Sequence, residues 1–182
     1  IDCLATTSVF TPKSKEELKS AIDKYLELSP KGDSSDGPYG IIGEWDVSRI
    51  TDMGNLFSTV TEDHEVFHGA LLFNGDISKW DVSRVKDMYR MFSGAKSFNG
   101  EISKWDVSRV TDMNCMFLSS VSFTGDLSKW DVSSVTSMAG TFARATSFNG
   151  DVSKWDVSSV LSMSGTFMRA TSFKCDLSKW DV

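Results

Sequence analysis

The chain has 182 residues, of which 40% are hydrophobic and 24% charged, and its formal net charge is −6. This composition is typical of a folded domain, and it contains no apolar stretch long enough to cross a bilayer, so we do not expect an integral membrane protein. The acidic balance excludes a general nucleic-acid binder, which needs a basic surface.

The first 40 residues predict an N-terminal capping helix followed by a loop. Ser14-Lys15-Glu16-Glu17 matches a capping box, the usual start of a helix. An apolar stripe follows, at Leu18, Ile22, Tyr25 and Leu26, and predicts an amphipathic helix over about 14–28. Residues 29–40 are rich in Ser, Gly, Pro and Asp, which is typical of a loop.

The rest of the chain, residues 41–182, is organised by a repeat. Trp-Asp-Val recurs six times, at 45–47, 80–82, 105–107, 130–132, 155–157 and 180–182. From Trp80 onward the spacing is 25 residues, and a fixed period in this range is typical of stacked repeat proteins. Such a stack needs its first apolar face covered, and we expect the N-terminal helix to cover it. The last copy stops within a repeat, so we expect further copies to follow.

Each 25-residue unit predicts one short strand and one short helix. Trp80 and Val82 alternate with polar residues, as in a strand. The apolar residues that follow have the spacing of one helix face, at Val85, Met88, Phe92 and Ala95. We therefore predict an α/β solenoid, a leucine-rich-repeat-like stack of strand–helix repeats with parallel strands and a buried column of tryptophans. The unit is too short for a blade of a WD-type propeller, which holds four strands.

The repeat phrase W-D-V-S-x-V-T-D-M-x-x-M-F, followed by A-x-x-F-N-G-D-I-S-K-W, resembles a known family. It is similar to the BspA-type, leucine-rich-repeat-like surface-protein repeats, also called mycoplasma lipoprotein-associated repeats, from about Trp45 to Val182. The resemblance implies a leucine-rich-repeat-like solenoid in a secreted or cell-surface protein, associated with adhesion or partner binding. It brings no catalytic residue and no cofactor.

The first repeat carries an insertion at about 58–69, because its tryptophan and the next one are 35 residues apart. The insertion contains His64-Glu65-Val66-Phe67-His68, which fits the H-E-x-x-H pattern of zinc hydrolases. The motif shares its predicted helix with the core positions Phe57 and Val60, and no third ligand follows it. We therefore favour a plain helical insertion. A metal held by His64 and His68, structural or adventitious, and a zinc-dependent hydrolase are the alternatives.

Two acidic columns also recur once per repeat. A lysine follows each residue of the first column after three positions, and the pairing favours a solvated, self-compensating face. A calcium-binding ladder is the alternative. The columns are Asp76, Glu101, Asp126, Asp151 and Asp176, and Asp46, Asp81, Asp106, Asp131, Asp156 and Asp181.

The residues that recognise a specific partner must lie at positions that differ between copies or in the insertion at about 58–69, because identical columns supply only a uniform surface. On the predicted helix and the turn after it, the candidates are Tyr89, Arg90, Leu118, Arg144, Met168 and Arg169. The sequence favours a non-enzymatic scaffold without a cofactor, which presents an extended surface to a protein or polysaccharide partner outside the cell or at its surface. A structural subunit of a larger assembly is the alternative, and a zinc-dependent hydrolase is less favoured.

Overall fold

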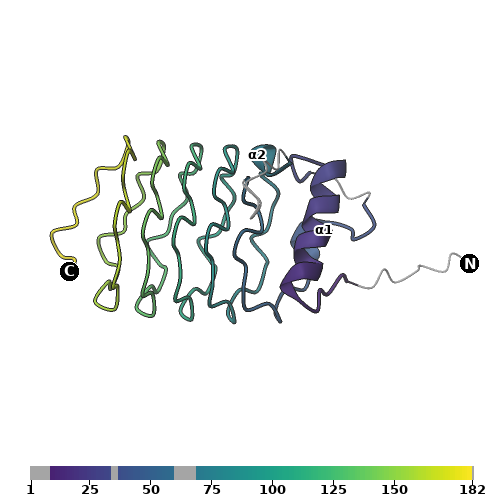
Figure 1. Cartoon of the computed structure of the whole chain (residues 1–182), viewed down its shortest axis with the longest axis horizontal. Helices are drawn as coiled ribbons and strands as arrows, with labels where there is room; N and C mark the ends of the chain where they lie inside the picture. The colour runs from purple at the N-terminus through teal and green to yellow at the C-terminus, as the bar shows by residue number, and fades with distance from the viewer. Residues whose placement is uncertain (1–8, 34–36, 60–68, 182) are drawn as a thin grey trace, which may run out of the picture.

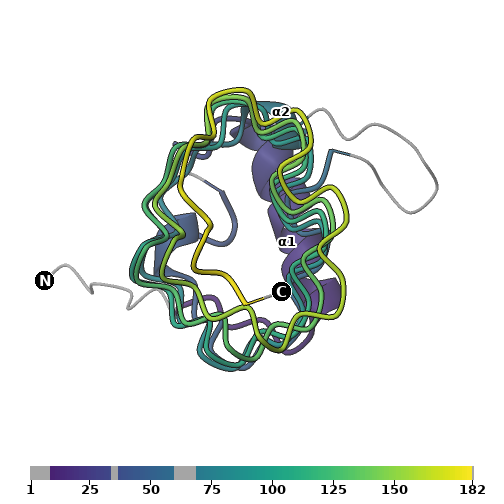
Figure 2. The same cartoon turned by 90° about the vertical axis from the view of Figure 1, so that its left-hand side faces the viewer.

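The computed structural model describes residues 9–33, 37–59 and 69–181. Within these ranges the regular elements are the helix α1 (Lys15–Leu28), the 3-10 helix η1 (Ile42–Glu44) and the one-turn helix α2 (Gly69–Leu72), and no strand forms. The rest of the described chain winds into coils that stack along one axis (Figure 1). The helix α1 lies at the N-terminal end of the stack. Viewed along the axis, successive coils superimpose as rounded loops (Figure 2).

The segments around each Trp-Asp-Val form turns, so the predicted strand is wrong. The Trp80 amide donates to the Ile77 carbonyl at 3.1 Å, and the Val85 amide donates to the Val82 carbonyl at 2.8 Å. The aspartate between them accepts a hydrogen bond from the amide of the serine two residues later, at 3.0 Å. Local bonds of this kind bend the backbone and occupy amides that a strand would offer to its neighbour.

The predicted helix in the second half of each repeat is also absent. The amides of Met88 and Phe92 donate to the carbonyls of Asp112 and Met116 in the following coil, both at 2.9 Å, and not to a carbonyl four residues back. Arg90, between them, has a φ of 53°, which a right-handed helix does not accommodate. The α/β solenoid, with its leucine-rich-repeat-like stack of strand–helix repeats, is therefore corrected to a stack of irregular coils.

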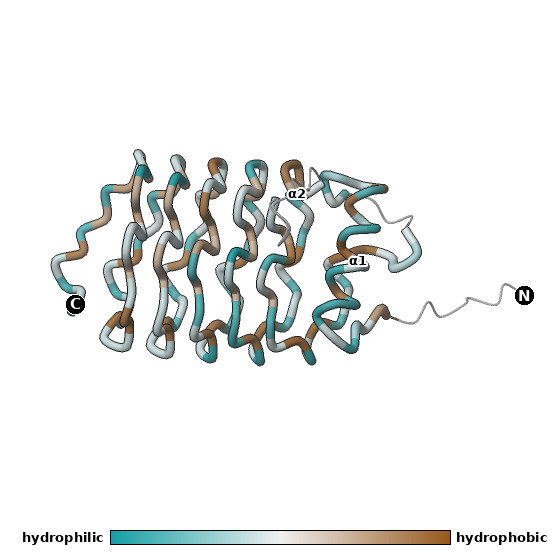
Figure 3. The backbone as a smooth tube through the Cα atoms, viewed as in Figure 1, coloured by the Kyte–Doolittle hydropathy of each residue, from teal (hydrophilic) through white to brown (hydrophobic). Residues whose placement is uncertain are grey.

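Parallel pairing does occur, but only as single bridges, in the segment where the sequence predicted a helix. The bridged residues lie one coil apart and form a single row, Asp52, Asp87, Asp112, Ser137 and Ser162. Backbone segments paired in this way lie about 4.8 Å apart. Hydrophobic and hydrophilic residues alternate along every coil (Figure 3), as expected where side chains point alternately into the stack and out of it.

The predicted burial of the repeating tryptophans is confirmed. Trp80, Trp105, Trp130 and Trp155 are only 3–5% exposed. Each indole Nε1 donates to a backbone carbonyl of the preceding coil, over 2.8–3.3 Å. A buried indole N–H needs such a partner, and here the partner also ties one coil to the next.

Two phenylalanines per coil continue the core as stacked rings. Neighbouring rings have centroids 3.9–6.0 Å apart and planes within 10° of parallel. Offset stacking at such distances adds to the free energy gained by burying the rings. The two rows are Phe57, Phe92, Phe117, Phe142 and Phe167, and Phe73, Phe98, Phe123, Phe148 and Phe173.

The helix predicted over about 14–28 is confirmed as α1. The Ser14 hydroxyl accepts a hydrogen bond from the Glu17 amide at 3.3 Å. The Glu17 carboxylate bonds the amide of Lys13, one residue before the position that a capping box would use. The apolar stripe of α1 is buried, and Tyr25 meets the edge of Trp45 at a centroid distance of 5.7 Å. The helix therefore covers the first coil.

We expect Trp130→Ala to lower the free energy of unfolding by about 3–5 kcal/mol, because it removes a buried ring and leaves the Ile102 carbonyl without its indole donor. Urea denaturation followed by circular dichroism measures the change. Trp180→Ala is the control and should cost less, because Trp180 is only partly buried at the end of the stack. Equal unfolding midpoints for Trp130→Ala and the parent protein would contradict the role given to the indole column.

Candidate functional site

All six candidate partner-binding residues lie on one surface of the stack, which we call the variable wall. It consists of residues 89–94, 114–119, 139–144 and 164–169, which follow the bridged residues in four successive coils. The backbone bonds Arg90 N to Asn114 O, Cys115 N to Ala139 O and Gly140 N to Ser164 O, each 2.9 Å, set these segments side by side. The candidates therefore stand in turns, and not on the predicted helix.

The candidates form two groups on the variable wall. Tyr89 and Arg90 are half-buried in one coil, and the Arg90 guanidinium lies 5.1 Å from the centre of the Tyr89 ring. Leu118, Arg144, Met168 and Arg169 form the second group, in three consecutive coils. Arg144 and Arg169 are exposed, Met168 is 52% exposed and Leu118 is half-buried. The second group therefore combines positive charge with accessible apolar surface.

The arginines of the variable wall stand at coil positions with a left-handed backbone, as do Cys115 and Ser119. Arg90, Arg144 and Arg169 have φ values of 53°, 58° and 60°, in the left-handed region that few residues other than glycine adopt. The sequence analysis missed this property. A signal was present, because Gly94 stands in the coil position of Arg144 and Arg169, and Gly140 stands in that of Arg90.

A row of carboxylates borders the variable wall in the first three coils. Asp52, Asp87 and Asp112 are the bridged residues, and the Oδ1 atom of each accepts a hydrogen bond from the amide two residues later, at 2.7–2.8 Å. Burial raises the pKa of Asp87, and the charges of the other two carboxylates raise it further, against the hydrogen bond from the Tyr89 amide. The sequence analysis did not single out this row, although the early repeats visibly carry a further acidic position besides those of the two columns.

The two acidic columns that the sequence did single out take part in turns. The Asp106 Oδ1 atom accepts from the Ser108 amide at 3.1 Å and from its hydroxyl at 2.6 Å. These bonds lower the pKa of Asp106, and the nearby Arg109 charge adds to the effect. Asp76 bonds Ser78 in the same way. The recurring aspartate is thus explained by turn formation, as in other Asx turns.

The described residues contain no cluster suited to a metal ion. Among them, no group of three or more His, Cys, Asp or Glu side chains could hold one. The acidic columns considered for calcium lie among these residues and form no such group. His64 and His68, and with them the zinc hypothesis, fall on residues 60–68, outside the described residues, as does most of the predicted insertion at about 58–69.

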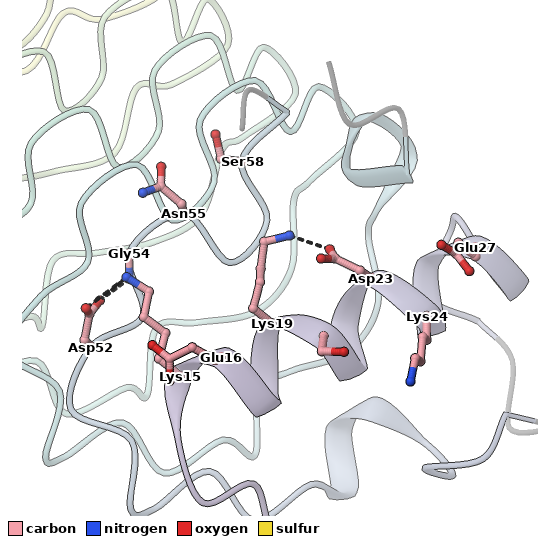
Figure 4. A pocket seen from close by; sticks show the side chains of 11 residues that line it. Lys15, Glu16, Lys19, Asp23, Lys24, Glu27, Asp52, Gly54, Asn55 and Ser58 are labelled. Carbon is pink, nitrogen blue, oxygen red and sulfur yellow. Dashed lines mark hydrogen bonds and ion pairs between the residues drawn. The ribbon is translucent and has the colours of Figure 1, made fainter. Parts of the chain in front are cut away.

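A groove of about 680 Å³ lies between α1 and the first coil. Four of its charged side chains form two pairs (Figure 4). Lys15 Nζ lies 2.8 Å from a carboxylate oxygen of Asp52, and Lys19 is paired with Asp23. The first pair joins α1 to the first coil, and the second lies within α1. The groove therefore ranks below the variable wall as a binding site.

A comparison with known families finds a match over the repeat region. The model of the family described as "Mycoplasma protein of unknown function, DUF285" matches residues 36–134 and 101–182. The chain belongs to this family. No curated protein and no solved structure matches it. The family description names no activity, so the site has to be interpreted from its own chemistry.

The described residues contain no helix that is both long and apolar enough to span a membrane.

We expect Asp87→Asn to raise the melting temperature at pH 7. The amide can still accept the Tyr89 hydrogen bond, but it removes a charge that is partly buried beside two others. The pKa of Asp87 is raised in the folded state, so the parent protein protonates this group as the pH falls through that pKa. The difference in melting temperature should therefore shrink on acidification. Differential scanning calorimetry at a series of pH values measures it.

Asp106→Asn is the control of opposite sign. The pKa of Asp106 is lowered in the folded state, so its stabilising contribution is present at neutral pH and is lost as the pH falls through that lowered pKa. This variant should melt slightly below the parent at pH 7. A lower melting temperature for Asp87→Asn at pH 7 would refute the assignment of unfavourable charge to the carboxylate row.

Proposed function

We propose that this protein is a non-enzymatic scaffold that presents the variable wall as a binding surface for a protein or polysaccharide partner. The observation that carries the proposal is that each coil contains constant positions, which build the fold, and variable positions, which lie together on one surface. Residues that are identical between copies fill the core or form turns, whereas Tyr89, Arg90, Leu118, Arg144, Met168 and Arg169 differ between copies and share one surface.

The chemistry of these residues supports a binding role. Arginine, tyrosine and methionine are enriched in the buried centres of protein interfaces, and arginine and tyrosine often contribute most of the binding free energy. Four coils in register offer an extended surface, which is how stacked-repeat proteins bind their partners. The resemblance of the repeat phrase to the BspA-type surface-protein repeats supports adhesion as the process and the extracellular space or the cell surface as the location.

Residues that other coils carry at the same position provide conservative tests. Tyr89→Ala introduces the residue found at 139, and Leu118→Ala and Met168→Ala introduce the one found at 143. Because these coils already accommodate alanine there, the triple variant should fold. We expect it to bind a partner captured from the native source at least tenfold more weakly than the parent, as measured by biolayer interferometry, because it loses three contact side chains.

The control variant carries Lys104→Ala and Lys129→Ala, on the exposed lysine column away from the variable wall. It should bind like the parent. Unchanged binding by the triple variant, with a melting temperature close to that of the parent, would exclude the variable wall as the contact surface.

A further inference from the structure

Arg144 and Arg169 occupy backbone positions that are unfavourable for arginine. Their φ values are 58° and 60°, and the left-handed conformation costs an ordinary L-residue about 1–2 kcal/mol relative to the right-handed one. Glycine adopts it at little cost, and glycine fills the same coil position at Gly94, with φ 75°. Ser119 also fills this position, with φ 59°, so the fold accepts glycine, serine or arginine there and does not require arginine at 144 or 169.

The two arginines form a pair on adjacent coils. The Arg144 amide donates to the Met168 carbonyl at 2.7 Å, which places Arg169 one coil spacing away, about 4.8 Å along the axis. Both side chains are exposed. The ion pairs of the described residues involve Lys15, Lys19 and Lys79 and neither arginine. Two guanidinium groups thus project side by side from one surface.

The sequence on both sides of each of these arginines lacks acidic residues. The stretches 113–125, 132–150 and 157–175 contain no Asp or Glu, although the whole chain has a net charge of −6. The row of carboxylates in the first coils is replaced here by Ser137 and Ser162. The wall of the last two coils is therefore a basic surface on an acidic protein, which favours an anionic partner.

Apolar surface beside the arginines selects among anionic partners. Leu118 is half-buried, and Met168, in the same position of the last stacked coil, is 52% exposed, whereas Ala143 between them is buried. A protein segment can supply apolar side chains to cover them, whereas a sulfated or carboxylated polysaccharide lacks such side chains. Guanidinium groups bind carboxylates through paired, charge-assisted hydrogen bonds. In an extended segment, carboxylates on one face recur about every 7 Å, within reach of two long side chains one coil apart.

We propose that Arg144 and Arg169 bind the carboxylates of an extended, acidic protein segment whose apolar side chains cover Met168 and Leu118. This inference rests on the proposed binding function of the variable wall and assigns the class of partner. The arginines are retained at left-handed positions because they bind this segment, at the expense of stability.

The first test separates stability from binding. Arg144→Gly with Arg169→Gly should raise the melting temperature by at least roughly 2–4 °C, since relieving about 1 kcal/mol of backbone strain has this effect in a chain of this size. Asn55→Gly is the control, because Asn55 also has a left-handed φ, of 63°, and lies outside the variable wall. It should leave binding unchanged and raise the melting temperature less, because asparagine tolerates this conformation better than arginine does. A lower melting temperature in the double variant would show that the arginines serve the fold and would overturn the proposal.

The second test measures binding by fluorescence anisotropy. The probe is a labelled peptide of alternating glutamate and leucine, and it should bind the parent more tightly than the corresponding lysine–leucine and glutamate–serine peptides. The double glycine variant should bind it about tenfold more weakly or worse, because each lost charged hydrogen bond is worth roughly a factor of ten. The variant Arg144→Lys with Arg169→Lys should bind the peptide with an affinity between those of the parent and the double glycine variant. Lysine keeps the positive charge but cannot form the paired hydrogen bonds of arginine.

Two outcomes of the second test contradict the proposal. If heparin binds through the same arginines and the glutamate–leucine peptide does not, the partner is a sulfated polysaccharide. If the double glycine variant binds the peptide like the parent, the arginines are not the contact. The proposed function is tested independently by the triple alanine variant of Tyr89, Leu118 and Met168, and it is wrong if that variant still binds the native partner. If the triple variant loses the native partner but the double glycine variant still binds it, the variable wall remains the binding surface and only the role given to the arginines is wrong.

Discussion

The fold depends on hydrogen bonds that join each coil to its neighbour. A coil without strands or helices leaves its amides and carbonyls unpaired, and burying them would cost more than the core could supply. In this protein the amides of one coil donate to the carbonyls of the next, and the indoles of Trp80, Trp105, Trp130 and Trp155 each add a further bond between coils. The tryptophan recurs because its N–H and its ring act together: the bond fixes the register between coils, and the ring fills the core.

This arrangement separates stability from recognition along the same 25 residues. The phenylalanine and tryptophan rows have the same residue in every coil because their neighbours above and below are the same. Residues 89, 114, 139 and 164 of the variable wall are in part accessible to solvent, so tyrosine, asparagine, alanine and serine all occur at this position. A binding residue can therefore change in one coil without any adjustment of the core.

The sequence was informative where local signals decide the structure. The Ser14 cap and the stripe at Leu18, Ile22 and Tyr25 predict α1 correctly because helix ends and amphipathic faces are set within a few residues. The burial of the tryptophans followed from the period. The predicted strand was wrong because local turns occupy its amides, such as that of Val85, which donates to Val82. The predicted helix was wrong because the amides of Met88 and Phe92 have partners in the next coil.

The binding surface was predictable only in part. Differences between copies singled out its residues, since that comparison needs no coordinates. Their shared surface and their backbone conformation depend on how coils align in space, and the left-handed positions became visible only when Arg144 could be placed in the row of Gly94. The carboxylates of Asp52, Asp87 and Asp112 were missed because nothing local distinguishes them from aspartates that form turns.

The regular stacking of the coils spaces the residues of the variable wall evenly along the axis. Each coil advances the surface by one backbone spacing of about 4.8 Å, so the distance between two wall residues along the axis is set by the number of coils between them. The adjacent coils that carry Arg144 and Arg169 place two positive charges one step apart. Exchanging the wall residues of two coils would move a charge by a whole step without disturbing the interior, so that partners with different charge spacings could be accommodated by rearranging copies of a single unit.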